Sequence, residues 1–116
     1  MDLINRMEEI IKKESEAIAS IKVTKEFVKA INIMKECEGK VLTTGIGKAG
    51  HMAKKFAATL CSTATPAAFV HPAESAHGDL GLVDKRDCLV VFSTSGKSVE
   101  VIEMVKLAKH LHLDKI

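Results

Sequence analysis

The stretch that most constrains the fold is Val41–Gly50, which reads VLTTGIGKAG. Two apolar residues and two threonines run into Gly45, Gly47 and Gly50. Glycines at this spacing let a chain leave a strand, turn sharply and enter a helix. The unpaired amides and the dipole at such a helix start favour an anion, and Lys48 adds a cation within the turn. The stretch therefore predicts a strand–turn–helix unit that binds a phosphorylated or otherwise anionic ligand.

The residues that follow repeat this strand, turn and helix pattern. Short apolar segments, typical of buried parallel strands, alternate with segments in which apolar residues recur every three or four positions, as in amphipathic helices. Such alternation predicts a parallel sheet with helices on its faces, an α/β fold. The expected strands are Val41–Leu42, Pro66–Val70 and Cys88–Phe92. One helix is expected to follow the glycines, through Met52 and Leu60, and another to span Glu100–Leu111. The segment His71–Gly81 is expected to be a loop or a short helical turn.

Two amphipathic helices are predicted before the first strand. Apolar residues recur at helical spacing from Leu3 to Ile21, and a second helix is expected from about Thr24 until Gly39 ends it. We interpret these helices, residues 1–38, as packing or dimerisation elements of a single domain whose α/β core begins at residue 39. Because Leu113–Ile116 resembles the approach to a fourth strand, we expect residues 39–116 to be the first half of a longer core.

Composition excludes several classes of function. The net charge is +2, acidic and basic residues are interspersed, and Trp and Tyr are absent, so neither a basic face nor a base-stacking platform for nucleic acid is predicted. No apolar run approaches the roughly 20 residues that a membrane span needs, and the charged N-terminus lacks signal-peptide character, so we expect a cytoplasmic protein. Cys37, Cys61 and Cys88 show no C-x-x-C spacing, which favours free thiols over a zinc ribbon or a redox pair.

The glycine motif alone leaves more than one nucleotide-binding alternative to consider. GIGKAG formally matches the dinucleotide pattern G-x-G-x-x-G, but no carboxylate follows about 20 positions later until Glu74, which disfavours a dehydrogenase. A P-loop is excluded because Lys48 is followed by Ala49. The later Gly96-Lys97-Ser98 run also fails, because Val91 stands where the P-loop glycine is required.

A second turn, STSGKS, follows the third predicted strand. Its hydroxyl groups, together with the amides at a helix start, form a neutral binding site for a phosphate monoester. The alternative is simple N-capping of the last helix by a serine. Because ligands bind at the carboxyl ends of parallel strands, both turns are expected at one edge of the sheet, which favours phosphate binding. The hydroxyl-bearing residues are Ser93, Thr94, Ser95 and Ser98.

The segment HPAESAHGDLG concentrates titratable side chains between the second and third strands. It carries His71, Glu74, His77 and Asp79 within nine residues. The spacing matches no recognised metal-binding pattern, so structural and functional roles remain equally open for these histidines.

Together, GIGKAGHMAKKFAATLCSTATPAAFVHPAESAHGDLG and STSGKSVE resemble the sugar isomerase (SIS) domain, and most of all its D-arabinose 5-phosphate isomerases. The resemblance implies a flavodoxin-like three-layer α/β/α sandwich. It also implies reversible interconversion of D-arabinose 5-phosphate and D-ribulose 5-phosphate through an enediol, in the synthesis of Kdo, a sugar of lipopolysaccharide and capsule. No cofactor would be required, the partner would be a small sugar phosphate, and relatives are homo-oligomers, which implies a dimer or a tetramer.

The resemblance also assigns roles to individual residues. It places Lys48, His77 and Glu100 in catalysis, with Glu100 as a base, Lys48 stabilising negative oxygen and His77 moving protons during ring opening. It places an inhibitory zinc at His71. The residues implied in substrate binding are Gly47, Thr65, His77, Ser93, Ser95 and Ser98.

The family pattern extends past this chain. Relatives carry a further active-site glutamate and histidine in the second half of the domain, beyond residue 116, and many append CBS modules. The alternative function is a non-catalytic sugar-phosphate-binding SIS module. The joint presence of Lys48, His77 and Glu100 favours the enzyme.

Overall fold

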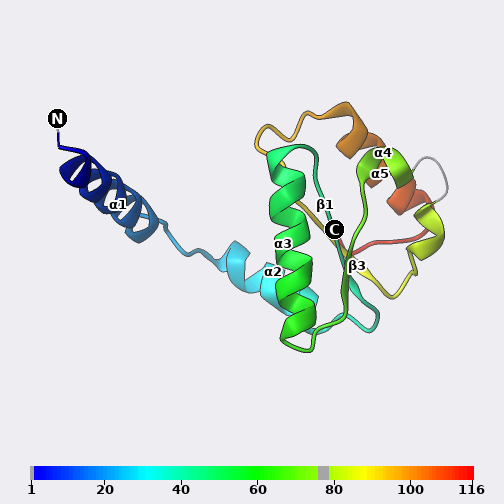
Figure 1. The fold of residues 1–116 in the computed structure, drawn as a ribbon. Coiled ribbons are helices and arrows are strands. Elements are labelled where there is room, and N and C mark those ends of the chain that lie inside the picture. The colour runs from blue at the N-terminus through cyan, green and yellow to red at the C-terminus, as the bar shows by residue number, and fades with distance from the viewer. Residues whose placement is uncertain (1, 76–78) are drawn as a thin grey trace. The chain divides into compact units, whose positions relative to one another are not determined.

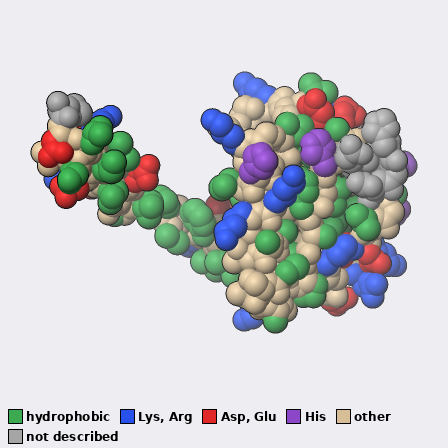
Figure 2. Space-filling model, viewed as in Figure 1, with side chains coloured by type: hydrophobic (Ala, Val, Ile, Leu, Met, Phe, Trp, Pro, Cys, Tyr) green, Lys and Arg blue, Asp and Glu red, His purple; other side chains and the backbone are tan. Residues whose placement is uncertain are grey.

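The computed structural model describes residues 2–75 and 79–116, and the chain separates into two units that meet between Ala30 and Ile31. The first unit contains α1 (Leu3–Ala19), which begins where the Asp2 carboxylate accepts a hydrogen bond of 2.9 Å from the Ile4 amide. Its apolar side chains are largely exposed and form the green surface of this helix in Figure 2. The next helix, α2 (Lys25–Lys35), crosses the boundary between the units.

The second unit is built on a parallel sheet of three strands (Figure 1). Its strands are β1 (Val41–Thr44), β2 (Ala67–Phe69) and β3 (Cys88–Val91), in the order β2-β1-β3. In the register of the sheet, Val41 lies opposite Ala67 on one side and Cys88 on the other. The predicted strands and their parallel arrangement are therefore confirmed, with β1 in the centre.

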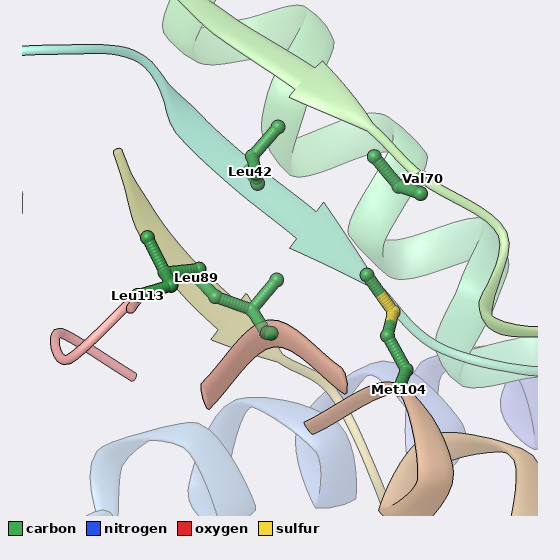
Figure 3. Close-up of a cluster of buried hydrophobic side chains, with 6 residues drawn as sticks. Leu42, Val70, Leu89, Met104 and Leu113 are labelled. Atoms are coloured by element: carbon green, nitrogen blue, oxygen red, sulfur yellow. The ribbon is translucent and has the colours of Figure 1, made fainter. Parts of the chain in front are cut away.

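Helices cover both faces of the sheet, because alternate residues of β1 point in opposite directions. On one face lies α3 (Lys48–Ser62), and the Thr43 hydroxyl donates a hydrogen bond of 2.7 Å to the Ala53 carbonyl of that helix. On the other face lies α5 (Val99–His110), whose Met104 belongs to the same buried cluster as Leu42 of β1 (Figure 3). The result is the α/β/α arrangement that the sequence predicts.

The main hydrophobic core lies between the sheet and α5. Six of its side chains are buried, and the chain beyond α5 completes it, because Leu113 is fully buried. The Leu89 amide of β3 also donates a hydrogen bond of 2.9 Å to the Lys115 carbonyl. The last residues therefore return beside β3, where the sequence predicts the approach to a fourth strand. The core residues are Leu42, Val70, Leu89, Met104, Ala108 and Leu113 (Figure 3).

Two short helices connect β2 to β3. They are α4 (Pro72–Ser75) and the 3-10 helix η1 (Asp79–Leu82), in keeping with the short helical turn predicted for this segment. Within the described ranges, 2–75 and 79–116, no helix combines the length and apolar character needed to cross a bilayer.

The amino ends of β1 and β3 are joined by the buried carboxylate of Asp87. It accepts hydrogen bonds of 2.8 Å from the Lys40 amide, the Lys40 ammonium and the Asp84 amide. The prediction that Gly39 ends the second helix is wrong, because α2 stops at Lys35. Gly39 is instead required for close packing, since a Cβ there would stand 2.3 Å from Asp87 Oδ1.

Replacing Asp87 with alanine is expected to destabilise this end of the sheet. The Lys40 and Asp84 amides would lose their acceptor inside the fold, at a cost of about 2–3 kcal/mol in the free energy of unfolding. Urea denaturation measures this loss. Asp84→Ala is the matched control, because it also removes an ionised carboxylate, but one whose ion pair with Arg86 is exposed to water. The hydrogen bond from Arg86 is the main cause that lowers the pKa of Asp84 to about 2. Equal losses in both variants would contradict the role of Asp87.

Candidate functional site

The glycine turn, residues 45–50, joins β1 to α3 at the carboxyl edge of the sheet. Gly47 is the N-cap of α3 and has a φ of 62°, which glycine adopts without strain. Lys48 is the first residue of the helix rather than the middle of the turn. The backbone of Gly50 approaches the strand end closely, since a Cβ on Gly50 would stand 2.7 Å from the Gly45 carbonyl oxygen. The glycines therefore bring the start of α3, with its free amides, directly against the end of β1.

Replacing Gly50 with alanine tests this close approach. The added methyl group would press on the backbone of Gly45, which cannot rotate away, so α3 must shift and the free energy of unfolding should fall by about 2–3 kcal/mol. Thermal or urea unfolding measures the change. Gly81→Ala is the matched control, because a Cβ at Gly81 meets no described atom within 4 Å. A Gly50→Ala protein as stable as the control would contradict the packing.

The serine turn, residues 93–98, joins β3 to α5 and is held by its own side chains. The Gly96 amide donates to Ser93 Oγ at 2.8 Å, and the Lys97 amide donates to Ser95 Oγ at 3.1 Å. A serine oxygen that accepts in this way leaves its own O–H able to donate to a ligand. The turn therefore presents hydroxyl donors beside the first amides of α5, which have no acceptor within the helix.

Both turns line one hollow of about 320 Å³ at the carboxyl edge, here called the rim hollow. The predicted meeting of the two turns is thus confirmed. Lys48 contributes the one charged side chain among the described residues that line it, so the hollow pairs a cation with hydroxyl donors. That combination suits a phosphate monoester. The lining residues are Ile46, Lys48, Ala49, Phe92, Ser93, Thr94, Ser95, Ser98 and Val101.

Glu100 lies in the first turn of α5 and is not itself a lining residue of the rim hollow, although Ser98 and Val101 on either side of it in the sequence are. Its Oε2 accepts a hydrogen bond of 3.2 Å from the Ser98 hydroxyl. Ser98 is the N-cap residue of α5 by backbone position, yet its side chain caps no helix amide. The capping alternative is therefore not realised, and the Ser98 side chain instead links the rim hollow to the Glu100 carboxylate.

A smaller hollow of about 140 Å³ adjoins the other side of the glycine turn. It includes His51, Lys54 and His71, and lysine and histidine side chains gather over α3 in Figure 2. His71 Nδ1 accepts a hydrogen bond of 3.1 Å from the Ala73 amide, which leaves Nε2 as the nitrogen able to meet a ligand. Gly47 also lines this hollow and not the rim hollow, so Gly47 and His71 lie together, apart from the serines.

The expected zinc at His71 needs further donors around the imidazole. In the described part of the chain no group of three or more His, Cys, Asp or Glu side chains is placed to hold a metal ion. The described residues therefore do not form a zinc site by themselves, and the zinc stays a prediction.

Two other predicted site residues are not brought to the rim hollow. Thr65 precedes β2 and lies at the amino edge of the sheet, where its amide donates a hydrogen bond of 2.8 Å to the Leu60 carbonyl. Because the rim hollow lies at the carboxyl ends of parallel strands, Thr65 is at the opposite edge. His77 lies outside the described residues. The roles of both stay predictions.

Several lining residues are apolar and were not singled out from the sequence. Ile46, Phe92 and Val101 form the floor and walls that surround the polar groups. Phe92 also packs edge-to-face on Phe56 of α3, with ring centroids 5.5 Å apart. Only their positions in the sequence could have indicated them. Ile46 lies within the glycine turn, Phe92 directly precedes the serine turn, and Val101 lies in the first turn of α5.

Comparisons with known proteins agree with this geometry. The SIS domain model matches residues 33–116. Arabinose 5-phosphate isomerase KdsD of Pseudomonas aeruginosa is 40% identical over the whole chain, and arabinose 5-phosphate isomerase GutQ of Escherichia coli K12 is 58% identical over 66% of it. The aligned part spans only 36% of KdsD and 24% of GutQ, about a third of these relatives or less.

Solved structures show the same fold. A Bacteroides fragilis crystal structure superposes with a TM-score of 0.93 at 39% identity, covering 98% of this chain and 62% of that protein. An Escherichia coli CFT073 protein in complex with arabinose 5-phosphate superposes with a TM-score of 0.86 at 38% identity, covering 95% and 60% of the two chains. From the match to most of its length, we conclude that the chain belongs to the SIS domain family.

Proposed function

We propose that the protein containing this chain is a D-arabinose 5-phosphate isomerase. The observation that carries the proposal is the rim hollow, in which Lys48 and the serine turn face one space. Relatives named arabinose 5-phosphate isomerase, and a structural neighbour in complex with arabinose 5-phosphate, support the choice of sugar phosphate. We further propose that the active protein is a homo-oligomer that serves Kdo synthesis.

The serine turn would hold the phosphate group. The hydroxyls of Ser93, Ser95 and Ser98 can donate to its oxygens, and the first amides of α5 add further donors with the helix dipole behind them. Binding at this end fixes the orientation of the open-chain sugar. Its carbonyl end then extends toward the glycine turn, where Lys48 begins α3.

The isomerisation moves one proton between neighbouring carbons. Starting from D-ribulose 5-phosphate, a base removes the proton from C1 and the electron pair forms the C1–C2 double bond of an enediolate, with negative charge on O2. Transfer of the O1 proton to O2, with return of a proton to C2, gives the aldehyde of D-arabinose 5-phosphate. Glu100 supplies the base, Lys48 stabilises the charged oxygen, and His77 assists proton movement in ring opening.

The hydrogen bond between Ser98 and Glu100 suits this sequence of events. In the structure the Ser98 hydroxyl donates to the Glu100 carboxylate. A phosphate that takes over the Ser98 hydroxyl would release that carboxylate for the sugar carbon. Release of this hydrogen bond frees a carboxylate oxygen of Glu100 to accept the proton from C1.

The experiment is to incubate the full-length protein with D-ribulose 5-phosphate and assay D-arabinose 5-phosphate. Formation of the aldose, and the reverse reaction from it, is the expected result. The alternative, a non-catalytic sugar-phosphate-binding module, predicts an unchanged substrate pool while binding remains detectable by calorimetry. If the protein neither converts nor binds the sugar phosphate, both the isomerase and the binding module are overturned.

A further inference from the structure

Two of the three thiols meet at the amino end of the sheet, far from the rim hollow in the fold. Cys37, in the loop between α2 and β1, places its Sγ 3.3 Å from the Arg86 carbonyl oxygen and 3.5 Å from that of Lys40. Cys88 is the first residue of β3, and its amide donates to the same Lys40 carbonyl at 3.2 Å. The pairing of β1 with β3 therefore brings together two cysteines that lie far apart in the sequence.

Both cysteines border the same Lys40 carbonyl oxygen, Cys37 through its Sγ and Cys88 through its amide. Their environments differ, because Cys88 is buried whereas Cys37 is half-exposed. Burial is the largest of the causes that together raise the pKa of the Cys88 thiol to about 12, so Cys88 stays protonated at neutral pH. A solvent-borne oxidant therefore reaches Cys37 first, and Cys88 is the neighbour placed to react with the product.

We propose that Cys37 and Cys88 form an intrachain disulfide when the protein meets a hydroperoxide. The Cys37 sulfur attacks the peroxide, the O–O bond breaks, and Cys37 becomes a sulfenic acid as the other oxygen leaves as water or an alcohol. The Cys88 sulfur then attacks the Cys37 sulfur as the Cys88 S–H proton passes to the departing oxygen, the S–O bond breaks, and water leaves. The two thiols lose two protons and two electrons, and the peroxide takes up both.

The surrounding fold allows this bond. A disulfide needs its two Cβ atoms about 4 Å apart, and Cys37 Sγ already lies 3.5 Å from the carbonyl oxygen that accepts the Cys88 amide, so a small closing movement would meet that need. Cys37 lies in a loop rather than in a helix or strand, so it can make that movement. The bond would tie this loop to β3 beside the Lys40–Asp87 ion pair, at the edge of the sheet opposite Lys48 and the serine turn. We therefore expect oxidation to raise the thermal unfolding midpoint without altering the rim hollow.

The test treats the purified chain with hydrogen peroxide at a few equivalents, counts free thiols, and maps peptides without reduction. The chain has three cysteines, and the expected result is one free thiol and a linked Cys37–Cys88 peptide, reversed by dithiothreitol. Cys61→Ser is the matched control. Cys61 is exposed and its Sγ lies 3.1 Å from the Ala67 carbonyl oxygen of β2, so this variant should still form the bond and retain no free thiol.

Cys37→Ser and Cys88→Ser should each abolish the linked peptide and the rise in the unfolding midpoint. Either variant alone shows whether the other cysteine pairs elsewhere. A linkage through Cys61, a disulfide between chains, or oxidation of Cys37 to a sulfinic acid without a link to Cys88 would overturn the proposal. Retention of all three free thiols after peroxide treatment would also overturn it.

Discussion

Replacing Glu100 with glutamine in the full-length protein is expected to lower kcat for isomerisation by about 10²–10⁴-fold, the usual contribution of a general base. Glutamine keeps the size of the side chain and can still accept from Ser98, so the start of α5 should stay intact. Substrate binding should therefore persist, with KM changed only a little. Steady-state kinetics with D-ribulose 5-phosphate, together with calorimetric binding, separates the two effects.

Glu103→Gln is the matched control for this experiment. Glu103 lies one helical turn further along α5, is exposed, and pairs at 3.8 Å with Lys106. Its replacement removes the same charge from the same helix without reaching the rim hollow, so kcat should be unchanged. Undiminished turnover in Glu100→Gln, or an equal loss in both variants, would remove Glu100 from the mechanism.

Replacing Lys48 with methionine is expected to lower kcat by about 10²–10³-fold, as the loss of one group that stabilises an oxyanion does. Methionine keeps the length and helix propensity of the side chain at the start of α3, so the glycine turn should keep its conformation. If Lys48 acts on the enediolate, the loss falls mainly on kcat. If it acts on the phosphate, KM rises instead, because that charge is the same in substrate and transition state.

Lys55→Met serves as the control, since Lys55 is an exposed lysine on α3 that lines neither hollow. It should behave as the unaltered protein in both kcat and KM. A Lys48→Met enzyme with full kcat would contradict the proposed stabilisation of the enediolate, and one with full kcat and unchanged KM would remove Lys48 from the site.

The parts of the fold that sequence predicts well depend on local patterns. The three glycines of the glycine turn and the apolar segment Cys88–Phe92 each carry a signal within about ten residues, and each lies in the structure as expected. The meeting of the two turns also follows from sequence, because carboxyl ends of parallel strands share one edge. The SIS resemblance is confirmed in the same region.

The remaining features depend on which distant residues the sheet brings together. Glycine at position 39 reads as a helix terminator from sequence, but its real constraint is the Asp87 carboxylate 48 positions later, which only the pairing of β1 with β3 reveals. The proximity of Cys37 and Cys88 at the Lys40 carbonyl arises from the same pairing, so C-x-x-C spacing could not show it. For Thr65 the local sequence is the better guide. The resemblance implies a role in substrate binding, but a residue that precedes a parallel strand lies at the amino edge of the sheet, away from the rim hollow.

The central claim is that the two turns bind one sugar phosphate together, with the serine turn at its phosphate group and the glycine turn at its carbonyl end. Its most direct test is a titration of the isotope-labelled protein with D-arabinose 5-phosphate, followed through the backbone amide signals. The account predicts saturable shifts confined to residues 93–101 and the start of α3, lost in a Ser95→Ala, Ser98→Ala double variant. The claim would be contradicted if these amide signals did not shift, or if the signals that shift lay beside exposed lysines elsewhere on the surface.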